Sequence, residues 1–490
     1  MTPAETQAAI QAFLQTCRQP ALLEPGEELL PLTPDNYAVE LRGTRLTLEA
    51  WDRHRNLTRR VTAIKETSPA KLEMIVERFA KREGKLFLLD LSRRAGAELG
   101  QRSGRLVFRE RFRLFLRRQF PEWKLIEVSA EANLEHSLSP AFSRGFLRYG
   151  QHGWAAIACP TEGDAAAVVT FGLIWLAYLR HREPKVTMEG LAIYVPAGTE
   201  RSAALRLLCL DPAKARFELF AYTAEDFVTR VDPHDHGNLD THLEPCTRPE
   251  PNLTEGWQSI VSLPGVERIP KQDGRISLRV RGIEFGELAG GELLFGLSER
   301  RTAREHHLPE IERLVSELAS ARDCDADRGH ALYRQYPESW LESQVRARLE
   351  TIDASLLSAP VYGQVPAFAG GDRGVLDLLA VDRGGRLAVI ELKASADLHL
   401  PLQSLDYWMR VKWHLDRSDF SANGYFPGME LRAGPPRLLL VSPCLDFHPP
   451  TETILRFFSP LIEVERIGLG VEWRRELNVM FRLTGAQQPR

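Results

Sequence analysis

The sequence of 490 residues has few cysteines, and none of them form a CxxC pair. This scarcity argues against a disulfide-stapled fold and against a structural zinc site of the usual thiolate type. The first 20 residues have no basic segment followed by an apolar core, so we expect no signal peptide and a cytoplasmic protein. The six cysteines are Cys17, Cys159, Cys209, Cys246, Cys324 and Cys444.

Long apolar runs and nucleotide-binding signatures are also missing. The longest apolar run, from Ala165 to Leu179, is about 15 residues, too short to span a bilayer comfortably. We therefore predict a buried helix there and no membrane association. No GxxxxGK[ST] loop occurs, which argues against built-in ATP-driven translocation, and no GxSxG elbow indicates an acyl-transfer hydrolase.

Charge is unevenly distributed along the chain. The net charge is −3, but the stretch from Asp52 to Lys124 holds 20 Lys and Arg against nine Asp and Glu. A local basic excess attracts polyanions, because each cation near a phosphate releases condensed counterions. The alternative interpretation is a solvated helical face whose charges pair with acidic residues elsewhere. On charge alone, nucleic acid is the favoured partner.

Two similar halves can be traced in the sequence. A β-like stretch at 38–51 precedes a helical pattern at 71–82, and a similar pair occurs at 277–290 and 310–322. Further on, 144–159 resembles 373–392, 167–182 resembles 398–414, and 190–198 resembles 437–445. Unbroken apolar runs such as LAVIEL and RLLLV are typical of strands covered on both faces. We therefore predict a duplicated α/β protein of α+β type, each copy preceded by a small β-rich subdomain.

The expected boundaries follow from this comparison. They are an N-terminal β-rich and helical subdomain at 1–100, a degenerate α/β domain at 101–230, a linker at 231–254, a second β-rich and helical subdomain at 255–330, and a final α/β domain at 331–490. The linker is rich in Pro, Asn, Asp and His. Its acidic and histidine side chains lack regular ligand spacing, so a solvated loop is the favoured interpretation.

The region that carries chemistry runs from about Glu338 to Leu415. A helix at 338–353 precedes a strand at 374–381, a DRGG turn and a strand at 386–394. Asp377 and Glu391 each lie inside an otherwise apolar strand, where a carboxylate is costly unless it is paired or binds a cation. With a three-residue loop, Asp382 pairs with Arg386 and Asp377 lies opposite Glu391. An even loop would separate the two acids.

Asp377, then Glu391-Leu392-Lys393, then the QxxxY of Gln403 and Tyr407, resembles the PD-(D/E)XK nuclease pattern, and the QxxxY resembles its RecB-like branch. The upstream Glu342 matches an acidic position of many members, and the preceding β-rich subdomain resembles NucS-like endonucleases. Leu376 stands where the pattern has proline. The match covers about 75 residues.

The resemblance implies a restriction-endonuclease-like fold and Mg²⁺-dependent hydrolysis of phosphodiester bonds, with Mn²⁺ as a substitute. Asp377, Glu391 and the backbone carbonyl of Leu392 would bind the metal, and Glu342 would hold the metal or its water. Lys393 would orient or deprotonate the attacking water. Gln403 and Tyr407 would steady the site and the phosphate. A hard cation prefers such oxygen ligands and lowers the pKa of bound water.

The first half lacks this chemistry. We align Arg148 with Asp377, Ala158 with Glu391, Pro160 with Lys393 and Thr170 with Gln403, so the first half is predicted to be a catalytically dead copy. Arg109, Arg113 and Arg117, spaced by four on a predicted helix, make it a candidate nucleic-acid-binding surface. Alternatively, these arginines merely keep the helix soluble.

The combined prediction is a metal-dependent endonuclease acting on nucleic acid, DNA in preference to RNA, in repair or defence. It would work either as a homodimer or as an intramolecular pseudo-dimer. The alternative is a non-catalytic nucleic-acid-binding or assembly protein that keeps the fold. Asp323, Asp325 and Asp327 do not fit a calcium loop, because Arg328 stands where that loop has glycine.

Overall fold

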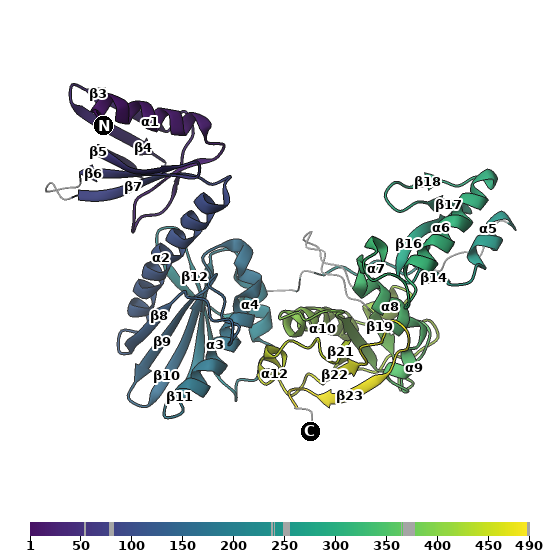
Figure 1. Cartoon of the computed structure of the whole chain (residues 1–490). Coiled ribbons are helices and arrows are strands. Elements are labelled where there is room, and N and C mark those ends of the chain that lie inside the picture. The colour runs from purple at the N-terminus through teal and green to yellow at the C-terminus, as the bar shows by residue number, and fades with distance from the viewer. Residues whose placement is uncertain are drawn as a thin grey trace. The chain divides into compact units, whose positions relative to one another are not determined.

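The structure, a computed structural model, describes the chain except for residues 53–54, 78–82, 237–238, 240, 248–254, 364, 366–377 and 488–490. The described residues form a mixed α/β protein with twelve α-helices and four sheets (Figure 1). Internal contacts divide it into two units. Unit 1 comprises 1–200 and 218–230, and unit 2 comprises 201–217 and 231–490. The short helix α4 (Glu200–Leu207) thus falls almost entirely in unit 2.

Unit 1 begins with helix α1 (Pro3–Thr16) on a seven-stranded antiparallel sheet in the order β2-β1-β7-β6-β5-β4-β3. Ile10 and Phe13 of the helix pack on the inward side chains of the sheet, including Leu48 and Leu86. The strands are β1 (Pro20–Leu23), β2 (Leu30–Pro31), β3 (Tyr37–Arg42), β4 (Arg45–Trp51), β5 (Asn56–Ser68), β6 (Lys71–Glu77) and β7 (Glu83–Asp90).

The prediction of a helix over 71–82 is wrong for the part that is described. Residues 71–77 are strand β6, which pairs with β5 and β7. Leu72, Met74 and Val76 are fully buried on one face, a period of two that identifies a strand. The matching segment of the second half is a true helix, α6 (Leu308–Ala321). The two small subdomains are therefore not copies of one another.

The rest of unit 1 is a six-stranded sheet in the order β13-β12-β11-β10-β9-β8. Helix α2 (Arg94–Gln119) packs on one face and α3 (Val168–Arg182) on the other. The expected boundary at 100–101 falls inside α2. The strands are β8 (Lys124–Ser129), β9 (Ser143–Tyr149), β10 (His152–Ala158), β11 (Thr187–Pro196), β12 (Arg216–Tyr222) and β13 (Val228–Val231), and the 3₁₀ turn η2 (Glu162–Ala167) precedes α3.

Helix α3 confirms the buried helix expected from the apolar run. It connects the parallel strands β10 and β11, packs on both, and buries nine of its residues. By length and composition, one helix of the described residues, Glu162–Arg182, is long and apolar enough to cross a membrane, and 56% of its apolar window is buried inside the protein. This burial is what a core helix between two parallel strands shows.

The first complete sheet of unit 2 is five-stranded and antiparallel, in the order β14-β15-β16-β17-β18, and α5 and α6 cover one of its faces. The β-structure expected at 277–290 and the helix expected at 310–322 are both confirmed. The elements are η3 (Pro233–His236), α5 (Glu255–Val261), β14 (Val266–Pro270), β15 (Ile276–Val280), β16 (Ile283–Ala289), β17 (Glu292–Phe295), β18 (Arg301–Thr302), η4 (Glu305–His307) and α6.

The last part of unit 2 is a five-stranded sheet in the order β19-β20-β21-β22-β23. Strands β20, β21 and β22 are parallel, and β19 and β23 are antiparallel to their neighbours. The elements are α7 (Ala331–Arg334), α8 (Pro337–Ala347), α9 (Leu349–Ile352), β19 (Leu378–Val381), β20 (Leu387–Leu392), α10 (Leu400–Asp416), α11 (Asp419–Ala422), β21 (Arg437–Pro443), α12 (Pro450–Leu455), β22 (Val464–Leu469) and β23 (Val479–Thr484).

The two larger sheets share the order helix, antiparallel hairpin, helix, parallel strand, but the expected alignment is wrong by one residue on the second hairpin strand. The N–H of Cys159 donates to Tyr194, the partner of Ala158, and the N–H of Lys393 donates to Val441, the partner of Leu392. Cys159 therefore corresponds to Lys393, and Ile157, not Ala158, corresponds to Glu391.

The same pairing corrects the alignment of Arg148. Ile157 pairs with Arg144, whereas Arg148 pairs with Gly153 near the turn. Arg144, not Arg148, thus stands at the position that Asp377 is predicted to fill. An offset of four residues along a strand keeps the side chain on the same face of the sheet, so the residue pattern alone does not reveal it.

Candidate active site

The hairpin of β19 and β20 has the register that the sequence analysis requires. The N–H of Asp382 donates to the carbonyl of Arg386 at 2.9 Å, which closes a three-residue loop. Gly385 supplies the left-handed residue at φ 78°. The pairs from Val381–Leu387 to Leu378–Ile390 follow without a break. Asp377 lies outside the described residues, so its position opposite Glu391 stays a prediction.

Glu391 is a carboxylate inside the sheet, and its side chain is only 3% exposed. Its neighbours Ile390 and Leu392 point into the core that includes Trp340 and Leu341 of α8. Side chains alternate along a strand, so Glu391 points to the opposite face, which α10 covers. A carboxylate in such a position requires a compensating partner or cation.

Lys393 follows β20 and extends its pairing. Its N–H donates to Val441 at 3.0 Å, so its side chain falls on the same face as that of Glu391. The Lys393 ammonium lies 3.4 Å from the Asp397 carboxylate, and both side chains are about three-quarters buried, at 22% and 28% exposure. Asp397 also accepts a hydrogen bond from the N–H of His399 at 2.8 Å. Asp397 is not among the predicted site residues, although its position just before α10 is a signal for it.

Helix α10 brings Gln403 and Tyr407 to this face of the sheet. It packs on β20 and β21, with Tyr407 buried and Gln403 half-buried. Between them, Asp406 accepts two hydrogen bonds from Arg206, at 2.9 and 2.7 Å. Arg206 belongs to α4 and is 5% exposed. This bidentate pair fixes the helix that carries Gln403 and Tyr407, and nothing in the linear spacing indicated it.

Two histidines add to the electrostatics of the site. Burial lowers the pKa of His399 and of His448, while the negative charge of Asp397 opposes both shifts. The positive charges of Arg206 and Lys393 lower the pKa of His399 further. Both imidazoles are therefore mostly neutral at pH 7 and add little to the positive charge of Lys393 and Arg206.

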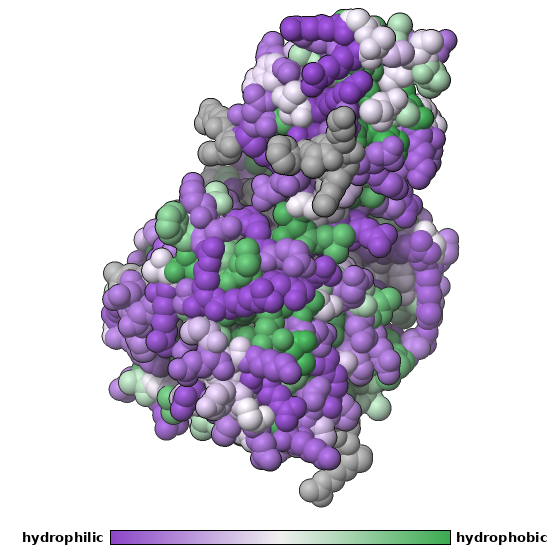
Figure 2. Space-filling view, turned by 90° about the vertical axis from the view of Figure 1, so that its left-hand side faces the viewer, coloured by the Kyte–Doolittle hydropathy of each residue, from purple (hydrophilic) through white to green (hydrophobic). Residues whose placement is uncertain are grey.

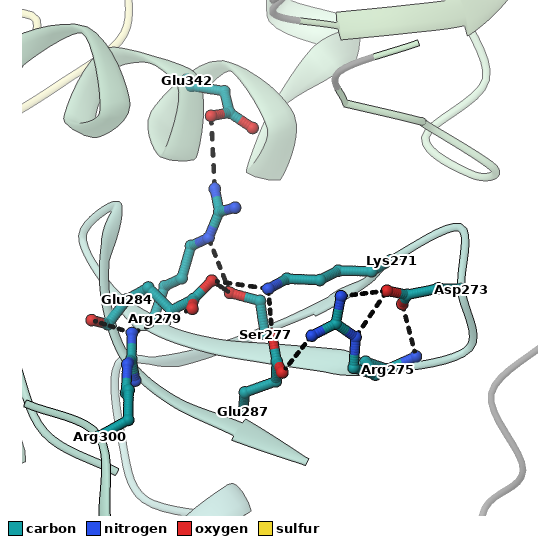
Figure 3. A network of polar contacts seen from close by, with 9 residues as sticks. All are labelled: Lys271, Asp273, Arg275, Ser277, Arg279, Glu284, Glu287, Arg300 and Glu342. Carbon is teal, nitrogen blue, oxygen red and sulfur yellow. Dashed lines mark hydrogen bonds and ion pairs between the residues drawn. The ribbon is translucent and has the colours of Figure 1, made fainter. Parts of the chain in front are cut away.

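Glu342 is held away from this group by two arginines. Its carboxylate lies 2.7 Å from Arg346, one turn further along α8, and 3.4 Å from Arg279 of β15. Figure 3 shows Glu342 pointing from its helix toward the small sheet. Helix α8 packs on the face of the β19–β23 sheet opposite to the one to which Glu391 points. The described contacts bring Glu391, Lys393, Gln403 and Tyr407 to one face and do not bring Glu342 to them.

Arg279 belongs to a network that covers one face of the small sheet (Figure 3). Its Nε donates to Ser277 at 3.0 Å. The remaining members pair with one another: Lys271 with Glu284 and Glu287, Arg275 with Asp273 and Glu287, and Arg300 with Glu284. These charges compensate one another, and the contact between Arg279 and Glu342 links the network to α8.

The three arginines predicted to bind nucleic acid lie on α2. Arg109 and Arg113 both contact the carboxylate of Glu110, each at 3.0 Å, which neutralises part of their charge. Arg117 is exposed. Arg111 is instead tied to Asp226 at 2.8 Å. Figure 2 shows that the side of the molecule with α2 is largely hydrophilic, with scattered apolar areas. The predicted binding surface stays a prediction.

Asp323, Cys324 and Asp325 form a cluster of metal-ligating types whose ligand atoms lie within 4.8 Å of one another. The carboxylate of Asp323 is 3.1 Å from Arg281, and that of Asp325 pairs with Arg475. Since arginines already compensate both charges, the cluster is no substitute for the predicted metal site.

Comparisons with protein-family models, with curated proteins and with solved structures find no match for this chain. The case for a function therefore depends on the residues themselves. Its two supports are the motif resemblance and the register of the hairpin that carries Glu391.

Proposed function

We propose that this protein is a metal-dependent nuclease with a restriction-endonuclease-like domain at 331–490, and that it hydrolyses phosphodiester bonds in DNA. The observation that carries the proposal is the buried carboxylate of Glu391, in the register that the motif requires, with the ammonium of Lys393 on the same face. Buried charged groups of this kind gather at functional sites more often than elsewhere in a protein.

The donor set fits a hard divalent cation. Glu391 offers carboxylate oxygen, and Asp377 and the carbonyl of Leu392 are the further ligands that the motif implies. Mg²⁺ takes such oxygen ligands and keeps several waters. When bound, it would lower the pKa of a coordinated water and offset charge on the phosphate.

The chain's own residues would then act on the substrate. Lys393 would place its ammonium against the phosphate or the attacking water, where a fixed positive charge stabilises the transition state. Asp397 holds that ammonium at 3.4 Å, which limits the positions that it samples. Gln403 and Tyr407, on a helix anchored by Arg206, would orient the phosphate through their amide and hydroxyl groups.

The first half supports a division of labour. Ile157, Arg144 and Cys159 occupy the positions that correspond to Glu391, Asp377 and Lys393. These three side chains offer no carboxylate, so they do not make an oxygen site for Mg²⁺. We propose that this half contributes substrate binding, through α2, rather than catalysis.

The test is cleavage of labelled single-stranded, duplex and branched DNA, and of RNA, with Mg²⁺, Mn²⁺ or EDTA. Glu391→Gln and Lys393→Met should each reduce the rate by at least about 10³-fold. Glu476→Gln, in the exposed segment between β22 and β23, is the matched control and should cut at the normal rate. Metal-independent cutting, or equal cutting by Glu391→Gln, would refute the proposal.

A non-catalytic nucleic-acid-binding protein is the second candidate. It is favoured by the pairing of Glu342 with Arg279 and Arg346, which occupies one predicted catalytic acid. Tight binding of an oligonucleotide with no cleavage under any metal condition, unchanged by Glu391→Gln, would establish this alternative.

A further inference from the structure

A small cavity of about 220 Å³ lies in unit 2 beside the connection between β22 and β23. Val471, Glu472 and Arg474 line it from that connection, and Cys324, Arg328 and Tyr333 line it from the segment between α6 and α8. Glu472 is its acidic lining residue. Glu472 is exposed and makes no ion pair with either arginine in the described part of the chain.

The guanidinium of Arg474 is held in place by aromatic rings. Its central carbon lies 4.3 Å from the ring centre of Trp473 and 5.1 Å from that of Tyr333. Its Nε is buried and donates to no hydrogen-bond acceptor in the described structure. Burial lowers the pKa of Arg474, and the nearby charge of Arg328 lowers it further. A preorganised guanidinium with unused donors is suited to an anion.

The other arginines near the cavity have hydrogen-bond or ion-pair partners within the protein. Arg475 pairs with Asp325, and Arg281 pairs with Asp323 at 3.1 Å. Arg322 donates to the backbone carbonyls of Leu332 and Gln335 at 2.9 and 2.6 Å. Among the described residues, neither Arg328 nor Arg474 has an ion-pair partner. The cavity thus brings together two arginines whose charges the protein does not compensate.

The cavity also lies at the edge of the sheet where Glu391 lies. The parallel strands β20 and β22 end at the same edge of the sheet. Glu391 is the penultimate residue of β20, and Trp473 and Arg474 follow shortly after the end of β22. Strands are about 4.8 Å apart, so β20 and β22 are separated by about 10 Å. Arg474 is on the α8 side of this edge and Glu391 faces α10, so a polymer that crosses the edge can reach both.

We propose that Arg328 and Arg474 form a phosphate-binding subsite that receives a phosphodiester of the nucleic-acid strand next to the one that is cleaved. This inference rests on the proposed function. The ligand chemistry is a phosphate group, which guanidinium donors recognise with two parallel hydrogen bonds. Such a contact positions the strand and carries no base specificity.

The first experiment measures binding by the full chain in EDTA, so that cleavage does not interfere. Arg328→Gln and Arg474→Gln should each weaken binding of a labelled oligonucleotide about tenfold. Each should also reduce the slope of log affinity against log salt by about 0.7 to 0.9. Arg475→Gln is the matched control, since Arg475 is adjacent but already paired with Asp325, and it should change affinity by less than about twofold.

The second experiment reports on the cavity itself. Cys324 lines it, so alkylation of Cys324, followed by peptide mapping with Cys17 as the reference thiol, measures occupancy. Oligonucleotide should slow Cys324 alkylation at least about threefold in the wild type but not in Arg474→Gln. Inorganic phosphate, the second arm, shows whether free phosphate occupies the same cavity.

The outcomes separate the inference from the proposed function. Unchanged affinity in Arg328→Gln and Arg474→Gln would overturn the subsite, whether or not DNA is cut. Protection of Cys324 by inorganic phosphate but not by oligonucleotide would overturn the nucleic-acid strand as its occupant. Weakened binding by both variants with no cleavage under any metal condition would support the subsite and refute the nuclease.

Discussion

The two hairpins β9–β10 and β19–β20 occupy the same place in the two larger sheets and bury very different chemistry. In the first, Arg144 is 3% exposed and donates to the backbone carbonyls of Ser139 and Glu131, and Ile157 pairs with it. In the second, Glu391 is 3% exposed, with Lys393 on the same face. The framework of hairpin, helix and parallel strand therefore does not require the acidic site. Mutations can test the stability of the framework and the chemistry of the site separately.

The largest expected effect is at Arg144. Arg144→Met should destabilise unit 1 by about 3 kcal/mol, because it removes two charged hydrogen bonds that the buried guanidinium donates to backbone carbonyls. Urea unfolding measures this, and Arg148→Met, on the exposed end of the same strand, is the control, with a loss of at most about 1 kcal/mol. Equal losses for the two variants would show that Arg144 is not structural.

The ion pair of Arg206 and Asp406 allows a second test, since it anchors α10, the helix that carries Gln403 and Tyr407. Arg206→Gln should destabilise unit 2 by about 2 kcal/mol, because a buried bidentate pair loses its donor. The thermal unfolding of the full chain reports this loss. Arg230→Gln removes an exposed contact to Glu218 and should cost less than about 1 kcal/mol. A loss no larger than that control's would contradict the anchoring role.

A double-mutant cycle decides the role of Glu342. If Glu342 mainly attaches α8 to the small sheet, Glu342→Gln and Arg279→Gln should show a coupling free energy of about 1 kcal/mol in urea unfolding. Their effects on DNA cleavage should then be similar and modest. If Glu342→Gln abolishes cleavage while Arg279→Gln does not, Glu342 belongs to the metal site as the motif implies.

The smallest expected effect is at Asp353, whose carboxylate pairs with Arg437 at the amino end of β21. Burial alone would raise the pKa of Asp353, but hydrogen bonds from Ser355 and Arg437 and the charge of Arg437 lower it to about 2. This ionised group stabilises the fold above its unfolded pKa near 4, and the contribution disappears as the pH falls from about 4 through 2. Unit 2 should lose about 1 kcal/mol over this range, after allowance for solvent screening.

Asp353→Asn is the variant that checks this pH dependence. At pH 7 the free energy of unfolding of this variant should be lower than that of the wild type. As the pH falls from about 4 to 2, the variant should lose less stability than the wild type, because the contribution of Asp353 is already absent. Stability is followed by urea unfolding at several pH values. An unchanged pH profile in Asp353→Asn would contradict the assignment.

Local patterns predicted the elements around the candidate site. The apolar runs predicted β20 and β21, the apolar spacing of Trp340, Leu341 and Val345 predicted α8, and the glycines predicted a turn before β20, whose loop length the structure then decided. The helix predicted over 71–82 failed because Leu72, Met74 and Val76 follow a period of two that becomes decisive only when β5 and β7 pair with the segment.

The sequence by itself determined which residue types are present, where the apolar strands lie and where the chain turns between β19 and β20, because these depend on local periodicity and on glycine. Only the tertiary structure decided the partners. Asp397 beside Lys393, Arg206 on Asp406, Arg279 on Glu342 and the cavity with Arg328 and Arg474 all join residues that separate elements bring together. Ion pairing and burial depend on distance in space, which residue spacing along the chain does not encode.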